Sequence, residues 1–317
     1  RRKDWGNKSM SSPLASRRQL RRLFVPKREK SSDNKSPMNR LHLPPALKQG
    51  ARVALVAPAR YASAELLKNA ENLLISWGFS PVIPLQSHLR SGQFGGDDKS
   101  RAAAMNAAFR NPDIHAVWAM RGGYGCTRLL PLLDGDAMKT HPTWITGFSD
   151  ITALHGWANR LGVASLHGPV ASTVEVTNSA DVEEMKEVWM SGKCGAQTKR
   201  VVGGNLSVLY ALLGTPYMPP LEGRWLLLEE VDEYLYHIDR MLVALSQAGV
   251  FDVVAGVMVG SFTDLRDNTK AHGQAVDNPF GMTIQGIVEE HIMSRGCAVE
   301  WDVPVGHGQR NIPLVLG

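Results

Sequence analysis

The stretch RVALVAPARYASAELLKNAENLLISW, residues 52–77, changes its hydrophobic pattern partway along. Residues 52–58 form an almost continuous apolar run, which predicts a buried strand. Residues 64–77 place apolar side chains at helical spacing, and Gly78 follows as a stop signal. A buried strand that leads within a few residues into an amphipathic helix is the repeating unit of a parallel α/β sheet.

The same unit recurs along the first half of the chain. We expect further strands at 81–85, 115–120 and 144–148, and helices at 99–109 and 151–161. Strands that alternate with helices at this spacing predict a doubly wound parallel sheet.

After about residue 169 the pattern changes. A polar, glycine-containing stretch is followed by expected helices at 206–213, 234–248 and 284–294, and by expected strands at 225–231, 253–262 and 298–305. This predicts a second α/β domain. We therefore divide the chain into a basic disordered tail (1–44), an N-terminal domain (45–170), a linker (171–200) and a C-terminal domain (201–317). The chain stops at Gly317 straight after an apolar run, which is consistent with a missing final strand.

The positive charge of the chain is concentrated in its first forty residues. The whole sequence has 317 residues with 35 Lys and Arg against 30 Asp and Glu, a net charge of +5. Residues 1–40 hold 13 basic and three acidic side chains (+10), which leaves −5 for the rest. A mildly acidic body gives no reason to expect nucleic-acid binding. We interpret the tail as an upstream extension, with Met38 opening the domain; a mitochondrial-type presequence is the alternative.

Composition excludes several other classes of protein. The 44% apolar content is normal for a globular chain, and we find no apolar run of the ~18–20 residues that a membrane span needs. The three cysteines, Cys126, Cys194 and Cys297, are too few and too scattered for a disulfide framework or a zinc site. We therefore expect a reduced, cytosolic-type enzyme with no metal and no cofactor.

Two candidate site segments follow expected strands, where open α/β sheets bind their ligands. The first is Arg121-Gly122-Gly123-Tyr124-Gly125, whose glycines allow a sharp turn that exposes N–H groups to an anion. An ordinary strand-to-helix turn explains the same residues. The segment does not have the GxGxxG pattern of nicotinamide-binding proteins.

The second segment is Gly147-Phe148-Ser149-Asp150, between the expected strand at 144–148 and the expected helix at 151–161. A serine on such a tight elbow holds its hydroxyl up beside the N–H groups of the helix start. The simpler interpretation is that Ser149 or Asp150 caps the helix.

A carboxylate and a histidine follow later strands. Glu229 and Glu230 end the apolar run from Trp225, and His307 lies between two glycines after the strand expected at 298–305. A histidine oriented by a carboxylate could activate Ser149 as a nucleophile. Successive strand side chains point to opposite faces, so only one of the two glutamates could reach the imidazole. A solvated strand end and a surface or core histidine are the simpler explanations.

These segments occur together with other motifs in a recognisable order. The motifs are ALVAPAR, RGGYGCTRLLPLLD, ITGFSDITALHGWANRLG, HGPV, GGNLSVLYALLGTP, WLLLEEVDEYLYHIDRMLVAL and VPVGHGQRNIPLVLG. Over residues 45–317 the sequence resembles the LD-carboxypeptidase family of serine peptidases, which includes the muramoyltetrapeptide carboxypeptidases and the microcin C immunity peptidases.

The resemblance implies a flavodoxin-like N-terminal domain that carries a nucleophile and a C-terminal domain that carries its partners. It implies a catalytic triad of Ser149, Glu229 and His307. The oxyanion hole would match the backbone N–H groups of Asp150 and Gly123.

The resemblance also implies the reaction. Such enzymes release the terminal D-Ala from murein tetrapeptide, at the bond after meso-diaminopimelate, through an acyl-enzyme in cell-wall recycling. The partner would be a murein-derived peptide and the assembly a homodimer, in the cytoplasm. Arg121 and Tyr124 are the candidates for substrate contacts, with Arg121 near the terminal carboxylate.

Three alternatives remain open. An immunity-type peptidase is the nearest, although the Gly-Tyr-Gly turn looks more like that of the murein enzymes. A cysteine hydrolase using Cys126 and a non-catalytic flavodoxin-like binding module belong to other classes.

Overall fold

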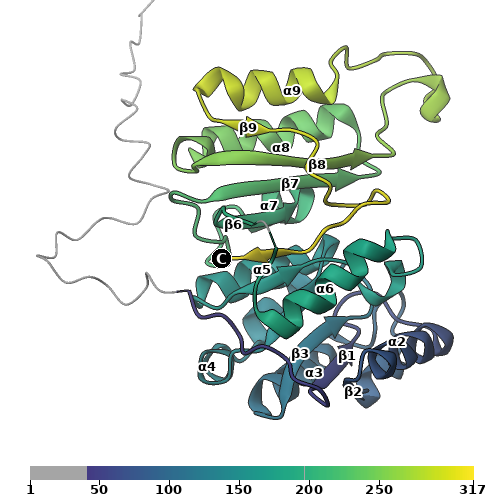
Figure 1. Cartoon of the computed structure of the whole chain (residues 1–317). Helices are drawn as coiled ribbons and strands as arrows, with labels where there is room; N and C mark the ends of the chain where they lie inside the picture. The colour runs from purple at the N-terminus through teal and green to yellow at the C-terminus, as the bar shows by residue number, and fades with distance from the viewer. Residues whose placement is uncertain (1–40, 196) are drawn as a thin grey trace, which may run out of the picture. The chain divides into compact units, whose positions relative to one another are not determined.

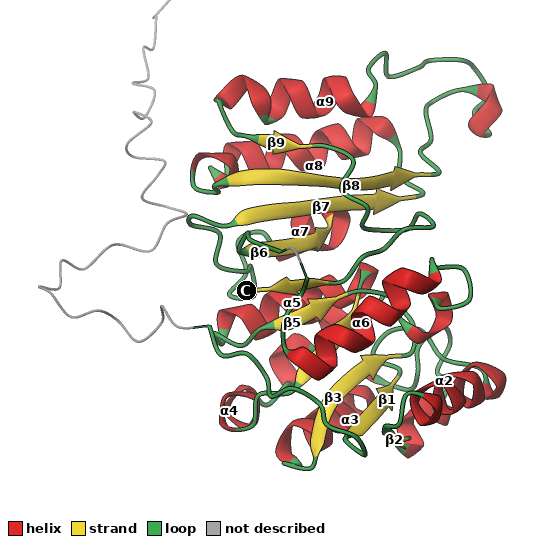
Figure 2. Ribbon diagram, in the orientation of Figure 1, coloured by secondary structure: helices red, strands yellow, loops and turns green. Residues whose placement is uncertain are grey.

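A computed structural model describes residues 41–195 and 197–317, and most of these residues lie in one α/β sheet with helices on its faces (Figures 1 and 2). In the first half the strands are β1 (Arg52–Val56), β2 (Ser80–Val82), β3 (Ile114–Ala119), β4 (Trp144–Gly147) and β5 (Ser165–His167). The helices there are α2 (Ala64–Ser76), α3 (Asp98–Arg110), α4 (Gly135–Thr140), α5 (Thr152–Arg160) and α6 (Ser179–Ser191).

The second half continues the same sheet. Its strands are β6 (Val201–Asn205), β7 (Trp225–Val231), β8 (Gly256–Thr263), β9 (Val299–Glu300) and β10 (Leu314–Leu316). Its helices are α7 (Leu206–Leu212), α8 (Leu235–Gln247) and α9 (Ile284–His291).

The strand order is β2-β1-β3-β4-β5-β10-β6-β7-β8-β9. The pairs among β1 to β5 and among β6 to β9 are parallel, whereas β10 runs antiparallel to β5. The first five strands follow the 2-1-3-4-5 order of flavodoxin-like sheets. The expected α/β class and the mainly parallel sheet are therefore confirmed.

Apolar side chains bury both faces of the sheet. In the first half, α2 and α6 cover one face with residues such as Leu67 and Trp189, and α3 and α5 cover the other with Phe109 and Trp157. In the second half, α7, α8 and α9 cover one face, and the opposite face packs against residues of the 303–316 segment.

Local signals explain where the expected helices begin. The side chain of Ser63 caps α2 by accepting a hydrogen bond from the backbone N–H of Leu66 (3.1 Å), and Asp97 caps α3 in the same way. Along α2, Leu67, Ala70 and Leu74 are buried at the three- to four-residue spacing that faces a sheet.

Several elements differ from the expectations. The segment 171–200, expected as a linker, contains α6, and the strands β5, β6 and β10 were not anticipated. The strand expected over 298–305 is reduced to β9. The last four residues of the expected tail, 41–44, begin the folded part, because the N–H of His42 donates to the carbonyl of Gly162 (2.8 Å). Residues 1–40, including Met38, lie outside the described residues.

Helix α6 binds the loop that precedes β10. The Asp181 carboxylate, only 1% exposed, accepts hydrogen bonds from Arg310 Nε (2.9 and 3.0 Å) and Nη2 (2.8 Å). It also accepts one from the backbone N–H of Asn311 (2.8 Å), and the Asn311 side chain accepts one from the N–H of Gly306 (3.1 Å). The 306–311 loop is therefore fixed to a helix of the first half.

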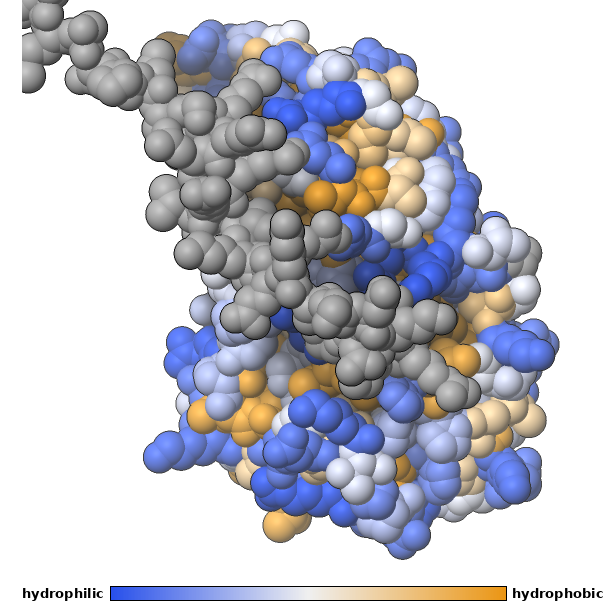
Figure 3. All heavy atoms as spheres, turned by 90° about the vertical axis from the view of Figure 1, so that its left-hand side faces the viewer, coloured by the Kyte–Doolittle hydropathy of each residue, from blue (hydrophilic) through white to orange (hydrophobic). Residues whose placement is uncertain are grey.

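The coloured residues in Figure 3 include both hydrophilic areas and separate hydrophobic patches. Among the helices of residues 41–317, none has the length and apolarity needed to cross a bilayer.

We expect Asp181→Ala to lower the free energy of unfolding by about 2–4 kcal/mol, because it leaves several charge-assisted hydrogen bonds unmade. The exposed Asp136→Ala is the matched control, with an expected change within about 0.5 kcal/mol. Urea unfolding of both variants measures the difference, and equal stabilities would contradict this account of the loop.

Candidate active site

The elbow at Ser149 is a strained strand-to-helix junction. Strand β4 ends at Gly147, Phe148 is extended, and Ser149 has a φ of 62° where a short 3₁₀ turn (Ser149–Ile151) begins. A positive φ costs a non-glycine residue energy, and such strain is concentrated at functional sites. A β-carbon on Gly147 would lie 2.8 Å from Ile151 Cγ1, so the turn requires glycine there.

The glycine-rich turn after β3 lies against the Ser149 side chain. A β-carbon on Gly122 would lie 3.0 Å from Ser149 Cβ and 3.2 Å from its Oγ. Within the described chain, the backbone N–H groups of Gly123 and Asp150 donate to no protein acceptor. The two predicted oxyanion donors therefore lie on the two segments that meet at the hydroxyl, and both are unoccupied by protein groups.

The Asp150 side chain holds these two segments together. Its buried carboxylate accepts a hydrogen bond from the backbone N–H of Cys126 (2.8 Å). Burial raises the pKa of Asp150, opposed by the Cys126 hydrogen bond and by the charges of Arg101 and Arg60. The sequence suggested the backbone of Asp150 and not this role of its side chain.

Cys126 is buried behind the turn. Burial and the neighbouring Asp150 raise the pKa of its thiol well above the ordinary value. A protonated, enclosed thiol is a poor nucleophile, which argues against the cysteine-hydrolase alternative.

Glu229 and His307 form a hydrogen-bonded pair. Glu229 lies near the end of β7 and is fully buried, and its Oε2 accepts the Nδ1–H of His307 at 2.7 Å. Burial alone would lower the pKa of His307. The hydrogen bond and charge of Glu229, with the charges of Glu230 and Asp264, outweigh it, so the pKa of His307 is raised.

Two glycines make room for the buried carboxylate. A β-carbon on Gly306 would lie 3.0 Å from Glu229 Oε2, and one on Gly260 would lie 3.1 Å from Glu229 Cβ. Strand β8 carries a bulge at this point, because the pairing with β7 skips from Leu228 to Glu230. Bulges of this kind are common beside active sites, where they redirect side chains.

Glu230 has a separate set of partners, as the alternation of side chains along a strand requires. Its carboxylate accepts hydrogen bonds from Asn205 Nδ2 (2.8 Å) and from the N–H groups of Ser207 (2.8 Å) and Val231 (3.0 Å). Burial raises the pKa of Glu230 despite these donors. It ties β7 to the start of α7.

The structure places the Glu229–His307 pair beside the elbow. The imidazole of His307 packs against the Phe148 ring with centroids 4.7 Å apart. Within the described residues, no hydrogen bond joins Ser149 Oγ to His307. Two members of the predicted triad are thus bonded to each other, and the third is next to them without a direct bond.

Two buried histidines lie beneath the elbow and were missed in the sequence. A ring nitrogen of His155, Nε2, is 2.8 Å from the carbonyl oxygen of Gly147, and burial lowers the pKa of His155 to about 4. The ring of His167 packs against Phe148 at 6.0 Å, and burial lowers its pKa as well. Their neutral rings support the elbow from inside the core.

The predicted substrate contacts are at the surface. Tyr124 is 46% exposed and its ring packs on Phe94 at 5.9 Å, and Arg121 is exposed. The sequence also missed Arg60, whose side chain lies across Gly123. Its position at the end of the VAPAR run, after β1, is the signal that could have identified it.

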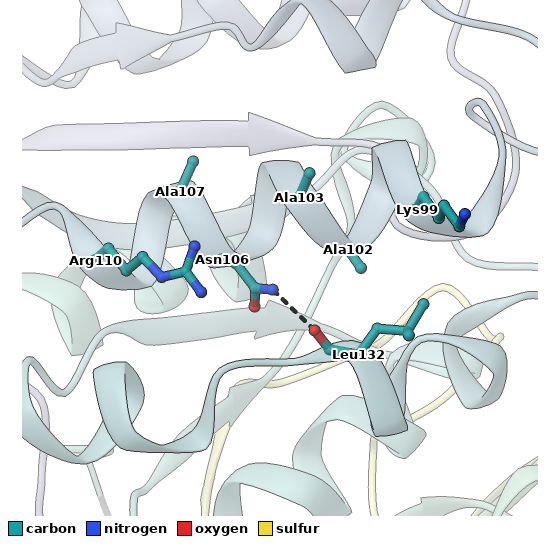
Figure 4. A pocket seen from close by; sticks show the side chains of 7 residues that line it. All are labelled: Lys99, Ala102, Ala103, Asn106, Ala107, Arg110 and Leu132. Atoms are coloured by element: carbon teal, nitrogen blue, oxygen red, sulfur yellow. Dashed lines mark hydrogen bonds between the residues drawn. The ribbon is translucent and has the colours of Figure 1, made fainter.

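Two hollows of the described surface lie away from these residues. The first, about 280 Å³, lies along α3 and is lined by Lys99, Ala102, Ala103, Asn106, Ala107, Arg110 and Leu132 (Figure 4). The second lies between α2 and the segment 171–175. Neither contains a predicted site residue. Residues 41–195 and 197–317 contain no group of three or more His, Cys, Asp or Glu side chains placed to hold a metal.

The chain is similar in sequence to proteins named as carboxypeptidases. A putative carboxypeptidase of Streptomyces coelicolor is 36% identical over 292 residues, which cover 85% of this chain and 93% of that protein. The murein tetrapeptide carboxypeptidase of Pseudomonas aeruginosa is 30% identical over 283 residues, covering 82% and 89%.

Solved structures show the same fold. A muramoyltetrapeptide carboxypeptidase from Oxalobacter formigenes aligns with a TM-score of 0.72 at 25% identity, covering 84% of this chain and 92% of that one. The microcin C7 self-immunity protein MccF aligns with a TM-score of 0.74 at 20% identity, covering 87% and 94%. Family models of the LD-carboxypeptidase N-terminal and C-terminal domains match residues 53–168 and 198–317. The chain therefore belongs to the LD-carboxypeptidase family.

Proposed function

We propose that this protein is a serine-type LD-carboxypeptidase that releases the terminal D-Ala from murein tetrapeptide in cell-wall recycling. The observation that carries the proposal is the buried Glu229–His307 pair beside the strained Ser149 elbow. Relatives named as murein peptide carboxypeptidases support the choice of substrate.

The first half of the reaction is acylation. Ser149 Oγ attacks the carbonyl carbon of the scissile bond while His307 Nε2 takes its proton. Glu229 holds Nδ1–H, so the imidazole keeps the tautomer whose Nε2 accepts a proton, and it stabilises the imidazolium that forms. The N–H groups of Gly123 and Asp150 stabilise the oxyanion.

Departure of D-Ala completes acylation, and deacylation then repeats the proton transfers with water. The tetrahedral intermediate collapses as His307 returns the proton to the departing amine of D-Ala, which leaves an ester on Ser149. Water then attacks the ester while His307 takes its proton. His307 returns this proton to Ser149 Oγ as the ester bond breaks, and the tripeptide leaves with a new carboxylate. The Ser149 hydroxyl must turn toward Nε2 for the first step, and the packing of Phe148 on the imidazole keeps the two groups adjacent.

From the family resemblance we also propose that the protein is a homodimer and that it acts in the cytoplasm, where recycled murein peptides are available. Sedimentation analysis of the purified protein measures the assembly, and a single monomer peak across micromolar concentrations would reject the dimer.

The reaction is tested by incubating the protein with murein tetrapeptide and weighing the products. We expect loss of one D-Ala and no internal cleavage. An aminoacyl sulfamoyl adenosine serves as the comparison substrate, and hydrolysis of that compound alone would replace this proposal with the immunity-type activity.

The substitution Ser149→Ala tests whether Ser149 is a nucleophile or only a helix cap. As the nucleophile, Ser149→Ala loses about 10³-fold or more in kcat, because the triad acts as a unit. As a cap alone, it would lose about 0.5–2 kcal/mol of stability and keep its activity. Steady-state kinetics and thermal unfolding on the same sample distinguish the two, and a fully active variant would reject the mechanism.

The pH dependence should follow His307, which must be neutral to accept a proton. Because the pKa of His307 is raised, the acid limb of kcat/KM should lie above about pH 6.5, the ordinary imidazole value. Glu229→Gln removes the main contributions that raise the pKa of His307 and leaves the burial that lowers it. Its kcat should fall about 10²–10⁴-fold, and the limb of the remaining activity should move to lower pH.

Glu230→Gln is the matched comparison. One amide oxygen cannot replace two carboxylate oxygens that accept three hydrogen bonds, so we expect a lower melting temperature and a smaller shift of the acid limb. The opposite ranking of the two variants in the pH profile would show that Glu230 orients the imidazole.

A further inference from the structure

Arg60 lies directly on the glycine-rich turn. A β-carbon on Gly123 would be 2.6 Å from Arg60 Cδ and Nε and 2.7 Å from its Cγ. The missing side chain at residue 123 therefore makes room for the stem of the arginine. The preceding residue, Gly122, contacts the proposed nucleophile Ser149. Arg60 therefore covers the residue next to that contact.

The backbone under Arg60 is fixed to its neighbours. Its N–H donates to the carbonyl of Gly122 (3.4 Å), and Arg60 forms an antiparallel bridge with Phe94. The adjacent Gly95 N–H donates to Ala59 (3.0 Å). The backbone that carries the Arg60 side chain is thus hydrogen-bonded to the glycine-rich turn that the side chain covers.

Two other arginines near the turn, Arg101 and Arg128, are already engaged. Arg101 is fully buried and donates to the carbonyls of Pro58 and Gly125, and Arg128 is paired with Asp98 (2.7 Å). Within the described residues, the guanidinium of Arg60 has no ion pair and no hydrogen bond, and it is exposed. Its charge acts on the Asp150 carboxylate only at a distance, so the guanidinium remains available to a ligand at the edge of the site.

We propose that Arg60 binds the free carboxylate of the substrate's terminal residue and so restricts the site to chain ends. The inference rests on the proposed carboxypeptidase function. In such a substrate the carbon of the terminal carboxylate lies roughly 3–4 Å from the scissile carbonyl carbon, by standard bond lengths. A guanidinium beside the oxyanion turn is within that reach, and its planar fork matches a carboxylate in a bidentate arrangement.

Arg121 is the competing candidate, because it is also exposed and begins the same turn. The described contacts place the Arg60 stem, and not that of Arg121, over Gly123, the residue proposed to stabilise the oxyanion. Arg60 is therefore the specificity-determining residue.

The test compares murein tetrapeptide with its C-terminal amide, which differs only in the charge of the end group. The full-length wild-type protein, Arg60→Gln, Arg60→Lys, Arg121→Gln and the distant Arg110→Gln are assayed on both. We expect wild type to prefer the free acid, and Arg60→Gln to lose about 10- to 100-fold in kcat/KM on the acid with a much smaller loss on the amide. Arg60→Lys should retain part of the preference, since a point charge replaces the fork.

The outcomes separate this inference from the proposed function. Retention of the acid preference by Arg60→Gln, or its loss in Arg121→Gln alone, would overturn the assignment while the carboxypeptidase activity stands. Failure of wild type to cleave either peptide would reject the function itself. Arg110→Gln controls for the loss of one positive charge, and it should match wild type on both peptides.

Discussion

The antiparallel pairing of β10 with β5 is the constraint on which the proposed site depends. Leu314 pairs with His167 at the end of β5, so the residues just before β10 lie at the edge where β4 and β5 also end. His307 belongs to those residues. One pairing register therefore decides whether the imidazole reaches the elbow. The hydrogen bonds that Arg310 and Asn311 donate to the Asp181 carboxylate hold the same loop to α6.

Buried carboxylates perform different tasks according to their partners. Asp150 accepts a backbone N–H and joins two loops, Glu230 joins a strand to a helix, and Asp181 holds the 306–311 loop. Glu229 faces an imidazole that can itself gain a proton, so its charge acts on a titrating group. Each of these carboxylates accepts at least one hydrogen bond, which offsets part of the cost of its burial.

The sequence predicts the local features of this structure well. Continuous apolar runs mark β1, β3, β4 and β7, and helical periodicity marks α2 and α5. The alternation of Glu229 and Glu230 follows from strand geometry. The short strands β6 and β10 lack a periodic signal, because one contains two glycines and the other has three residues. Val182, Met185 and Trp189 mark the buried face of helix α6, but the polar, glycine-containing composition of the surrounding segment predicts a linker there.

Contacts between distant residues could not be predicted in this way. Arg310 and Asp181, or Arg60 and Gly123, meet only because the sheet brings their loops together. The resemblance to a family identified the triad candidates, but it contained no information about the side chains around them in this chain.

The division of the site between early and late strands has a consequence for synthesis of the protein. The segment with Ser149 leaves the ribosome well before His307 does, and the loop with His307 leads directly into the strand β10 that pairs with β5. A nascent or truncated chain that lacks β10 would display the serine elbow without its base. In our proposed mechanism such a chain has no hydrolase activity, so incomplete chains would not cleave the peptides around them.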